Sequence, residues 1–400
     1  MAQYWGRPLV CLQVLASVLA VAGVLGCPSS ASSQTVRGVT DTEIVIGTIA
    51  DLSGLGAPQG VNNTAAIRMV FDDANTKGGV HGRRIKYIVE DSQVTVSRAV
   101  QAINKLINSD NIFITLATAF TPIHDAIVPM QLAKNVPSIF PAIAARSTYE
   151  PYNRLKFAQF ASYYDQTRAA VRYFAEQRGR KAFCGMYQDA GMGTEVAAGV
   201  VAQSEAMGMK VVATTLHKGA DTDFNAPVFK LQEAGCDVII LATAVRDTNL
   251  IIQTIRRMGM NVDLVGQFVA YDLAVAGLAG GVAEGFFCIS PGLYAYPDDL
   301  RPAVQAFANE YKQRFNRDPN FYGEAGYTAA NLVLLALDKA GRELTVDSFI
   351  EALESIHDYK DIFGYELSFG PDQHHGSTKS YLSVVQNGRW VPVTKQTLSY

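Results

Sequence analysis

Short apolar runs rich in β-branched residues alternate with longer amphipathic runs along the first half of the chain. EIVIGTIA at 43–50 has the composition of a strand, and RRIKYIVEDS at 83–92 alternates apolar and polar residues with the period of two that a strand requires. Between them, the run at 60–79 predicts a helix that its final glycines end. The pattern continues with predicted helices at 96–110 and 123–135 and predicted strands at 111–117 and 136–142. Strands that alternate with helices predict a parallel sheet covered by helices on both faces.

The same alternation restarts near Tyr163 and continues to residue 268, which predicts a second lobe of the same kind. No short sequence repeat relates the two halves, so their similarity is one of pattern only. The predicted helices fall at 165–181, 194–209, 225–236 and 245–260, and the predicted strands at 182–187, 210–216, 237–243 and 262–268. We therefore expect an α/β fold made of two doubly wound parallel-sheet lobes.

The last third of the chain departs from this alternation. It carries predicted helices at 300–315, 321–341 and 345–356, followed by strand material at 379–390. Asn387-Gly388 within that segment is a dipeptide typical of a two-residue hairpin turn. No low-complexity linker separates the lobes, which favours several short crossings between them over one flexible tether.

The charge balance leaves the predicted fold unchanged and excludes one class of partner, nucleic acid. The 400 residues include 34 basic and 37 acidic side chains, for a net charge of −3, and 48% of them are hydrophobic. Such a chain is long enough for two domains with separate cores, and its bulk is too apolar to be disordered. Because the sequence has no basic stripe, it offers no electrostatic footprint for nucleic acid, and we expect no nucleic-acid partner.

Residues 1–38 predict a secretory signal peptide followed by a tether. One cation, Arg7, precedes a charge-free run at 9–26, which is the layout of an exported protein. A transmembrane anchor is the alternative, although the run is barely long enough to span a bilayer. The sequence VLGC, which ends in Cys27, resembles a bacterial lipobox, whose cysteine is lipidated and holds the protein at a membrane surface. The competing prediction is ordinary cleavage after Ala31, which releases a soluble periplasmic protein.

Three further cysteines, Cys184, Cys236 and Cys288, each lie beside or inside an apolar segment. No CxxC motif occurs in the sequence, so a zinc site or a redox motif is not supported. We expect these three cysteines to be buried thiols rather than partners in a disulfide.

Known catalytic motifs are absent from the sequence. No GxSxG elbow, Walker A loop or HExxH motif occurs, and no acid/base pair stands out, so we expect a protein that is not an enzyme and that holds no metal or cofactor. SGLGAPQG at 53–60 fails as a dinucleotide fingerprint because Gln59 stands where the third glycine belongs, and it predicts instead a ligand-facing loop before a helix. His374-His375 is predicted to be a solvated turn. Thr121 is expected to cap the following helix or, equally, to donate its hydroxyl to a ligand.

Several segments together resemble the branched-chain amino acid type of periplasmic substrate-binding protein, which serves ABC transporters. In chain order they are EIVIGTIADLSG, NTKGGVHGRRIKYIVEDS, AVQAINKLI, VPSIFPA, AEGFF and FGPD. The resemblance implies the type I fold, in which three hinge crossings join two α/β lobes that close on a ligand at the carboxyl ends of their strands. It also implies that a single chain delivers this small molecule to a membrane permease. The implied lobes are residues 39–158 plus 289–366 and residues 159–288 plus 367–400.

The resemblance also assigns candidate ligand-binding residues, several of which depart from the pattern of amino acid-binding members. Thr121 keeps a hydroxyl that contacts the ligand carboxylate, Ala142 falls where the backbone contributes, and Tyr322 keeps an aromatic ring. Phe268 stands where a glutamate meets the ammonium group of the ligand. The other departures are Gln59, Ala144, Met192 and Val245.

The ligand expected from these departures is apolar. An ammonium group that is buried without a counter-charge costs several kcal/mol, and Phe268 supplies no charge. We therefore expect an aromatic compound or a lipid-like or sterol-like molecule, with one polar end held by Ser53, Gln59, Thr121 and a helix N-terminus. If Asp272 or Glu324 supplies the missing charge, the chain is instead an amino acid-binding protein. A ligand-sensing receptor domain is the remaining alternative.

Overall fold

The computed structural model describes residues 36–54, 56–394 and 396–400. The predicted signal peptide, most of the tether and the predicted lipidation at Cys27 therefore lie outside the described residues. Among the helices that the structure describes, none has the length and hydrophobicity that a membrane span requires.

The first sheet consists of parallel strands in the order β2-β1-β3-β4-β5. β1 (Glu43–Ala50) is buried over nearly its whole length, because strands flank it on both sides and helices cover both faces. β2 (Arg84–Asp91) forms an edge of the sheet and is more exposed. The remaining strands are short: β3 (Ile114–Leu116), β4 (Ser138–Ile139) and β5 (Lys156–Phe157).

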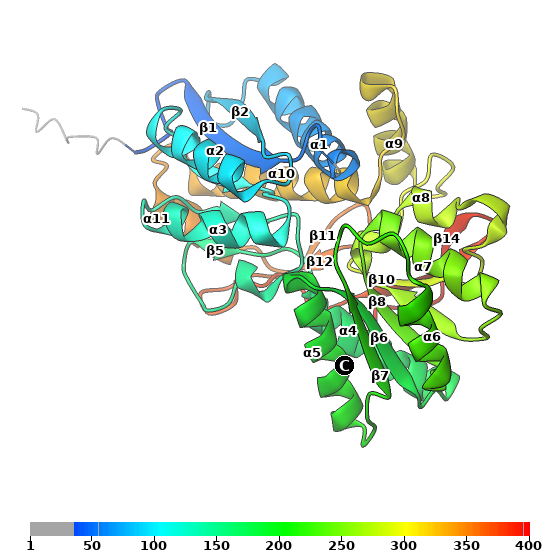
Figure 1. The fold of residues 1–400 in the computed structure, drawn as a ribbon. Helices are drawn as coiled ribbons and strands as arrows, with labels where there is room; N and C mark the ends of the chain where they lie inside the picture. Colours follow the sequence, from blue (N-terminus) through cyan, green and yellow to red (C-terminus); the bar gives the residue numbers. More distant parts are fainter. Residues whose placement is uncertain (1–35, 55, 395) are drawn as a thin grey trace, which may run out of the picture. The chain divides into compact units, whose positions relative to one another are not determined.

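Helices lie on both faces of this sheet (Figure 1). α1 (Ala57–Thr76) and α10 (Phe321–Ala340) pack side by side on one face. α2 (Val96–Asn108) and α3 (Thr121–Leu132) pack together on the other. The two helices that flank α10 in the chain, α9 and α11, also belong to this lobe and span Pro302–Phe315 and Val346–Glu354.

The second sheet has the strand order β14-β13-β10-β9-β8-β6-β7. Its parallel strands are β6 (Phe183–Gln188), β7 (Ala213–His217), β8 (Val238–Ala242), β9 (Asp263–Gly266) and β10 (Phe287–Ser290). β13 (Tyr381–Gln386) pairs antiparallel with β10, and β14 (Arg389–Pro392) pairs antiparallel with β13. Asn387 and Gly388 join them with φ values of 52° and 72°, which confirms the predicted hairpin turn.

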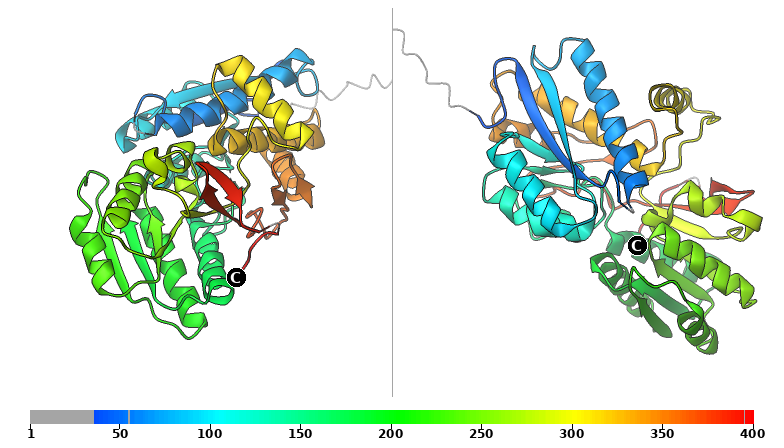
Figure 2. Two further views of the ribbon diagram at one scale, coloured as in Figure 1. Left: turned by 90° about the vertical axis from the view of Figure 1, so that its right-hand side faces the viewer. Right: turned by 45° about the horizontal axis from the view of Figure 1, so that its top comes forward.

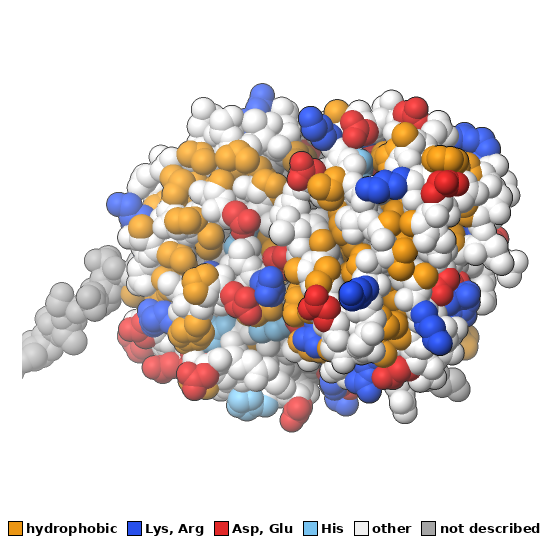
Figure 3. Space-filling view, turned by 60° about the horizontal axis from the view of Figure 1, so that its bottom comes forward, with side chains coloured by type: hydrophobic (Ala, Val, Ile, Leu, Met, Phe, Trp, Pro, Cys, Tyr) orange, Lys and Arg blue, Asp and Glu red, His pale blue; other side chains and the backbone are white. Residues whose placement is uncertain are grey.

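Helices also cover both faces of the second sheet (Figures 1 and 2). α4 (Tyr163–Arg178) and α5 (Gly191–Ala206) pack on one face, and α6 (Asn225–Glu233) and α7 (Val245–Arg257) pack on the other. On the face drawn in Figure 3, basic and acidic side chains are interspersed with apolar ones over the described residues.

The chain passes between the two lobes three times. The crossings follow β5, β10 and the short pair of strands β11 (Tyr359–Lys360) and β12 (Glu366–Leu367). The predicted fold, two α/β lobes joined by three crossings, is therefore confirmed. The exact lobe boundaries at residues 158, 288 and 366 stay predictions.

Helix starts follow the local sequence where a capping side chain is present. Ser162 and Asp165 form a reciprocal capping box at the start of α4, and Asn320 accepts backbone N–H bonds at the start of α10. The prediction that Thr121 caps α3 is wrong. The helix already includes Thr121, because Pro122 is tolerated in a first helical turn, and the residue before the helix, Phe120, makes no side-chain cap.

The cysteine prediction is also wrong for two of the three residues. Cys184 and Cys236 form a disulfide, with their Cα atoms 5.8 Å apart. Cys236 lies just before β8, which pairs directly with β6, so that Cys184 lies opposite Ile239. The order of strands in the sheet brings the two cysteines together, and that order is not visible in the spacing of cysteines. Cys288 is a buried free thiol, as predicted.

Candidate ligand-binding site

The predicted ligand-binding residues lie mainly where strands of the two sheets end. Thr121 follows β3 in the first lobe, and Met192, Val245 and Phe268 follow β6, β8 and β9 in the second. The two lobes meet there: a Cβ atom built at Gly191, the first residue of α5, would lie 3.3 Å from Cγ2 of Thr121. Carboxyl ends of parallel strands are the general location of ligand sites in open α/β sheets.

Phe268 is fully buried in a cluster of aromatic rings contributed by both lobes and by the crossings. Its ring stacks on Tyr163, with centroids 5.5 Å apart and planes 11° apart, and lies 5.4 Å from Phe321 and 6.0 Å from Tyr322. Phe160, on the first crossing, lies 5.7 Å away. We call these five residues the aromatic cluster. The sequence places only Phe268 and Tyr322 in it.

Gln267 fixes the loop that carries Phe268. Its side-chain oxygen accepts a hydrogen bond from the Val269 N–H at 2.9 Å, and its amide nitrogen lies 3.1 Å from the sulfur of Met192. Gln267 is 1% exposed, so the polar side chain that directly precedes Phe268 in this loop is a buried, uncharged amide. This residue was missed in the sequence because nothing in the local pattern shows that it points inward.

Ala142 and Ala144 are buried, and both use backbone groups within the first lobe and its crossing. The Ala142 N–H donates to the Thr118 carbonyl at 3.0 Å, and the Ala144 carbonyl accepts from the Tyr163 N–H at 2.7 Å. The second bond ties Ala144 to a member of the aromatic cluster. Val245, the first residue of α7, is half-buried and packs on the apolar core.

Ser53 and Gln59 are not brought to the aromatic cluster by any contact in the structure. The Ser53 hydroxyl donates to Asp91 at 2.6 Å and accepts from Gln93 at 2.8 Å, in an exposed network. Gln59 is half-buried in the first turn of α1. The neighbouring loop is filled by its own carboxylate, because Asp51 accepts hydrogen bonds from the N–H groups of Gly54 and Gly56, both at 2.6 Å. Those two N–H groups are therefore not left for a ligand.

The two carboxyl groups considered as partners for an amine differ in their surroundings. Asp272 accepts a hydrogen bond from the Ala274 N–H at 2.8 Å and caps α8 (Leu273–Ala276), while burial raises its pKa. Glu324 is fully buried, and its Oε1 accepts from the Ala295 N–H at 2.8 Å. Burial raises the pKa of Glu324 to about 8, so this carboxyl is mainly protonated at neutral pH.

Glu324 lies one helical turn beyond Phe321 and has a free oxygen. Its Oε2 makes no hydrogen bond among the described residues, and neither do the buried hydroxyls of Tyr294 and Tyr365. Tyr365 reaches the aromatic cluster through Phe160, with ring centroids 6.1 Å apart. The Tyr365 phenol thus lies beside the aromatic cluster, and Tyr294 contacts it through Tyr271, which packs on Phe321. Both phenols and the Glu324 carboxyl have unused hydrogen-bonding capacity.

The prediction that His374-His375 forms a solvated turn is wrong. His374 is buried against Phe157, with ring centroids 3.7 Å apart, and its Nε2 lies 3.0 Å from Glu354. His375 stacks on Tyr149 with centroids 4.1 Å apart. The segment after the third crossing pairs with Ala158, directly after β5, through a parallel bridge at His375. This pairing buries a segment that has the sequence of an ordinary polar turn. No group of three residues suited to hold a metal ion occurs in the described ranges.

A comparison with a family profile identifies the protein family to which this geometry belongs. The profile described as periplasmic binding protein matches residues 43–389. The chain belongs to this family. It is a type I periplasmic binding protein of the branched-chain amino acid-binding group, as the resemblance in the sequence implied. Proteins of this kind are the extracytoplasmic solute-binding components of ABC transporters.

Relatives of this binding protein differ in the ligands that their names state. A leucine-, isoleucine-, valine-, threonine- and alanine-binding protein of Pseudomonas aeruginosa is 24% identical over 316 residues, 78% of this chain and 82% of the relative. A fatty acid ABC transporter substrate-binding protein from Thermomonospora curvata has a TM-score of 0.81 at 24% identity, covering 92% of this chain and 95% of that one. A solute-binding protein of R. palustris, solved with benzoate, has a TM-score of 0.77 at 18% identity, covering 89% and 96%.

Proposed function

We propose that this binding protein closes its two lobes on a small, largely apolar ligand, an aromatic or lipid-like acid, and delivers it to a membrane permease. The observation that carries the proposal is the burial of Phe268 among Tyr163, Phe321 and Tyr322, at the position where amino acid-binding members are expected to carry a glutamate. A buried ammonium group beside these rings has no charged partner and costs several kcal/mol.

An apolar ligand can be held there by surface burial. About 300 Å² of ligand surface removed from water at ~25 cal/mol/Å² gives roughly 7 kcal/mol, a micromolar-scale affinity before ordering costs. The hydroxyl of Thr121, at the contact between the lobes, is the group we assign to the polar end of the ligand. A solved relative described as a fatty acid transporter substrate-binding protein and another solved in complex with benzoate support this class of ligand.

Calorimetric titration tests the proposal with a fixed panel: benzoate, octanoate, leucine, isoleucine and valine. We expect micromolar binding of benzoate or octanoate and no heat of binding with leucine, isoleucine or valine. Micromolar affinity for any branched-chain amino acid, without binding of the two acids, would refute an apolar ligand.

The second candidate is amino acid binding, and Glu324 is the observation that favours it. Its Oε2 is a buried carboxyl oxygen that makes no hydrogen bond among the described residues and lies two positions from Tyr322 of the aromatic cluster, and the Pseudomonas relative is named for amino acids. If this candidate holds, leucine binds to the wild-type protein and Glu324→Gln abolishes that binding, because the amide cannot neutralise the ligand's ammonium group. A receptor domain that senses the same ligand without delivering it is distinguished by the absence of transport in a host that carries the permease.

We further propose that Cys27 carries lipid and holds a monomeric protein at the outer surface of a membrane. Mass spectrometry of the mature protein purified from its host would show an acylated N-terminal Cys27. An unmodified N-terminus at Ser32 would support release into the periplasm instead. Size-exclusion chromatography with light scattering would test the monomer.

A further inference from the structure

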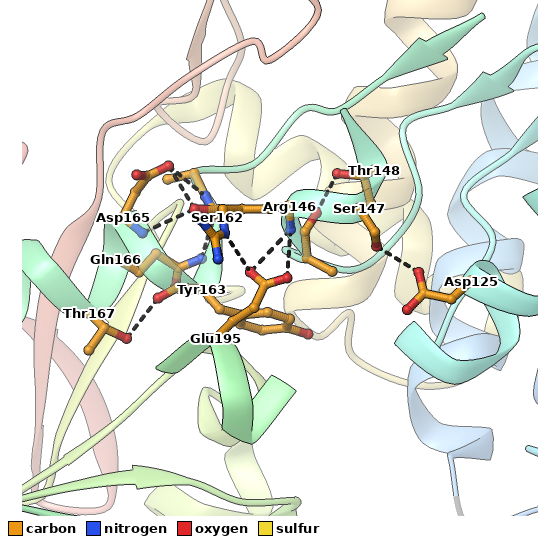
Figure 4. Close-up of polar contacts among 12 residues, drawn as sticks. Asp125, Arg146, Ser147, Thr148, Ser162, Tyr163, Asp165, Gln166, Thr167 and Glu195 are labelled. Atoms are coloured by element: carbon orange, nitrogen blue, oxygen red, sulfur yellow. Dashed lines mark hydrogen bonds and ion pairs between the residues drawn. The ribbon is translucent and has the colours of Figure 1, made fainter. Parts of the chain in front are cut away.

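A carboxyl group of the second lobe is bound to the backbone of the first. Glu195 lies on α5, and Arg146 opens the 3-10 turn Arg146–Thr148 that follows β4. Figure 4 shows the Glu195 carboxyl pointing at the Arg146 backbone, whose N–H lies 2.9 and 3.1 Å from the two carboxyl oxygens. The Arg146 guanidinium is farther away, with Nε 3.8 Å from Oε2.

This contact lies on the same two segments that carry candidate ligand-binding residues. Arg146 follows Ala144 by two positions, and Glu195 follows Met192 by three. Ala144 is itself bound to Tyr163 of the aromatic cluster. A movement that brings the two lobes together on a ligand therefore also brings Glu195 to the Arg146 N–H.

The Glu195 side chain is 16% exposed and is surrounded by groups of both signs. Arg146 faces it from the 3-10 turn, Glu150 from the segment after that turn, and Asp125 from α3. The negative charge of Glu195 also contributes to the raised pKa of Tyr149 and of Tyr163. Asp125 is tied to Ser147 by a hydrogen bond of 2.6 Å, so its negative charge is held close to the turn (Figure 4).

We propose that Glu195 is a proton-linked latch that holds the two lobes together on the bound ligand. The neutral carboxyl keeps an oxygen that accepts the Arg146 N–H, and it avoids placing a third carboxylate beside Asp125 and Glu150. The latch rests on the proposed function in one respect, which is that binding of a ligand drives closure of the lobes. It applies equally to an apolar ligand and to an amino acid.

The direction of the pH effect follows from the two states of the carboxyl. In a separated pair of lobes Glu195 faces water and titrates with its ordinary pKa of 4.5, whereas in the contact burial raises its pKa to about 7. Because the raised pKa belongs to the closed form, this contribution to closure is complete below pH 4.5 and is lost progressively as the pH rises from 4.5 to somewhat above 7. Between pH 8 and pH 6 this linkage strengthens binding about tenfold.

Isothermal titration in buffers of different ionisation enthalpy measures the proton directly. With benzoate, octanoate and leucine used in turn, we expect whichever binds to be accompanied by uptake of about half a proton at pH 7 and about a tenth at pH 8. Glu195→Gln keeps the shape and the acceptor oxygen but cannot titrate, so its proton uptake should vanish and its affinity should change less than twofold between pH 6 and pH 8.

Glu205→Gln is the matched control, because Glu205 is exposed on the same helix. It should keep the wild-type proton uptake, and thermal melting of all variants shows whether each is folded. Equal proton uptake by the wild type and Glu195→Gln, or no uptake by the wild type, overturns the latch.

If none of the three ligands binds, the proposed function fails, while the latch is still decided by NMR of the protein in the form described here, with Glu195 in contact with the Arg146 N–H. The amide resonance of Arg146 should shift with a midpoint near pH 7 in the wild-type protein and stay constant in Glu195→Gln. A resonance that does not respond to pH in either protein would rule the latch out.

Discussion

The disulfide between Cys184 and Cys236 gives a prediction whose magnitude can be worked out from the fold. It joins Cys184 in β6 to Cys236, which lies two residues before β8, across a sequence separation of 52. In the chain-entropy account, closing a loop of this length in the unfolded state stabilises the folded protein by about 4 kcal/mol at 25 °C. For a lobe of about 150–250 residues, removing the disulfide and with it this stabilisation lowers the melting temperature by roughly 10 °C.

The perturbation is the double substitution Cys184→Ala with Cys236→Ala, compared with the wild type in the presence and absence of dithiothreitol. Guanidinium denaturation followed by circular dichroism should show a lower midpoint for the reduced wild type and for the double variant. The double variant should no longer respond to dithiothreitol. Binding of the ligand should be little changed, because Cys184 lies near the start of β6 and Cys236 lies just before β8, whereas Met192 and Val245 follow the opposite ends of these strands.

Two results would refute this reasoning. One is a wild-type midpoint that is the same with and without dithiothreitol although alkylation shows both thiols to be free after reduction. The other is recovery of Cys184 and Cys236 as free thiols, in peptides separate from that of the free Cys288, from the unreduced protein purified from its own host. A persistent disulfide agrees with an extracytoplasmic location, where thiols are oxidised.

The remaining predictions concern the site and its charges. Phe268→Glu should abolish binding of benzoate and lower the free energy of unfolding by about 3 kcal/mol or more, because it buries a charge against Tyr163. Phe268→Leu is the control variant. A titration of Phe268→Glu that matches the wild type would show that this loop does not line the site. Glu324→Gln should flatten the pH profile of stability. The folded pKa of Glu324 is about 8, above the ordinary 4.5, so the wild type loses stability as pH rises toward 8, and the glutamine variant should not. Denaturation midpoints from pH 5 to pH 9 would show parallel curves if Glu324 is not the titrating group. Gly388→Ala should destabilise the β13–β14 hairpin by about 1 kcal/mol, since φ is 72° there; an unchanged unfolding midpoint would contradict this.

Most helices and strands could be predicted because their apolar periodicity is strong and local. β1 was predicted at the residues where it occurs, 43–50, because a continuous apolar run ends at polar residues on both sides. α1 and α5 each begin three residues before the predicted start. Neither helix has a capping side chain, since Gly56 and Ala190 precede them. Pro58 in the first turn of α1 is the one start signal that the sequence offers for these two helices. Strands of two residues, such as β4 and β5, are too short to show a period.

The candidate site was less predictable because its partners come from distant segments. The sequence indicates that loops after strands carry ligand contacts, which is why Thr121, Met192 and Phe268 fall at strand ends. It gives no sign that Tyr163 stacks on Phe268, since this depends on how α4 packs against the loop after β9. The hydrogen bonds from its own loop to Asp51 depend on the local backbone geometry. The contact between Glu195 and Arg146 depends on the approach of the two lobes.

Strand β10 is completed by chain that is synthesised much later. Its neighbour on one side is β9, but the neighbour on its other side, β13, comes only after α9, α10 and α11. Until that segment emerges, Phe287 to Ser290 present unpaired backbone groups on an apolar rim, the kind of surface that aggregates or recruits chaperones. The sheet of the second lobe therefore cannot be completed until residues Tyr381–Gln386 have been synthesised.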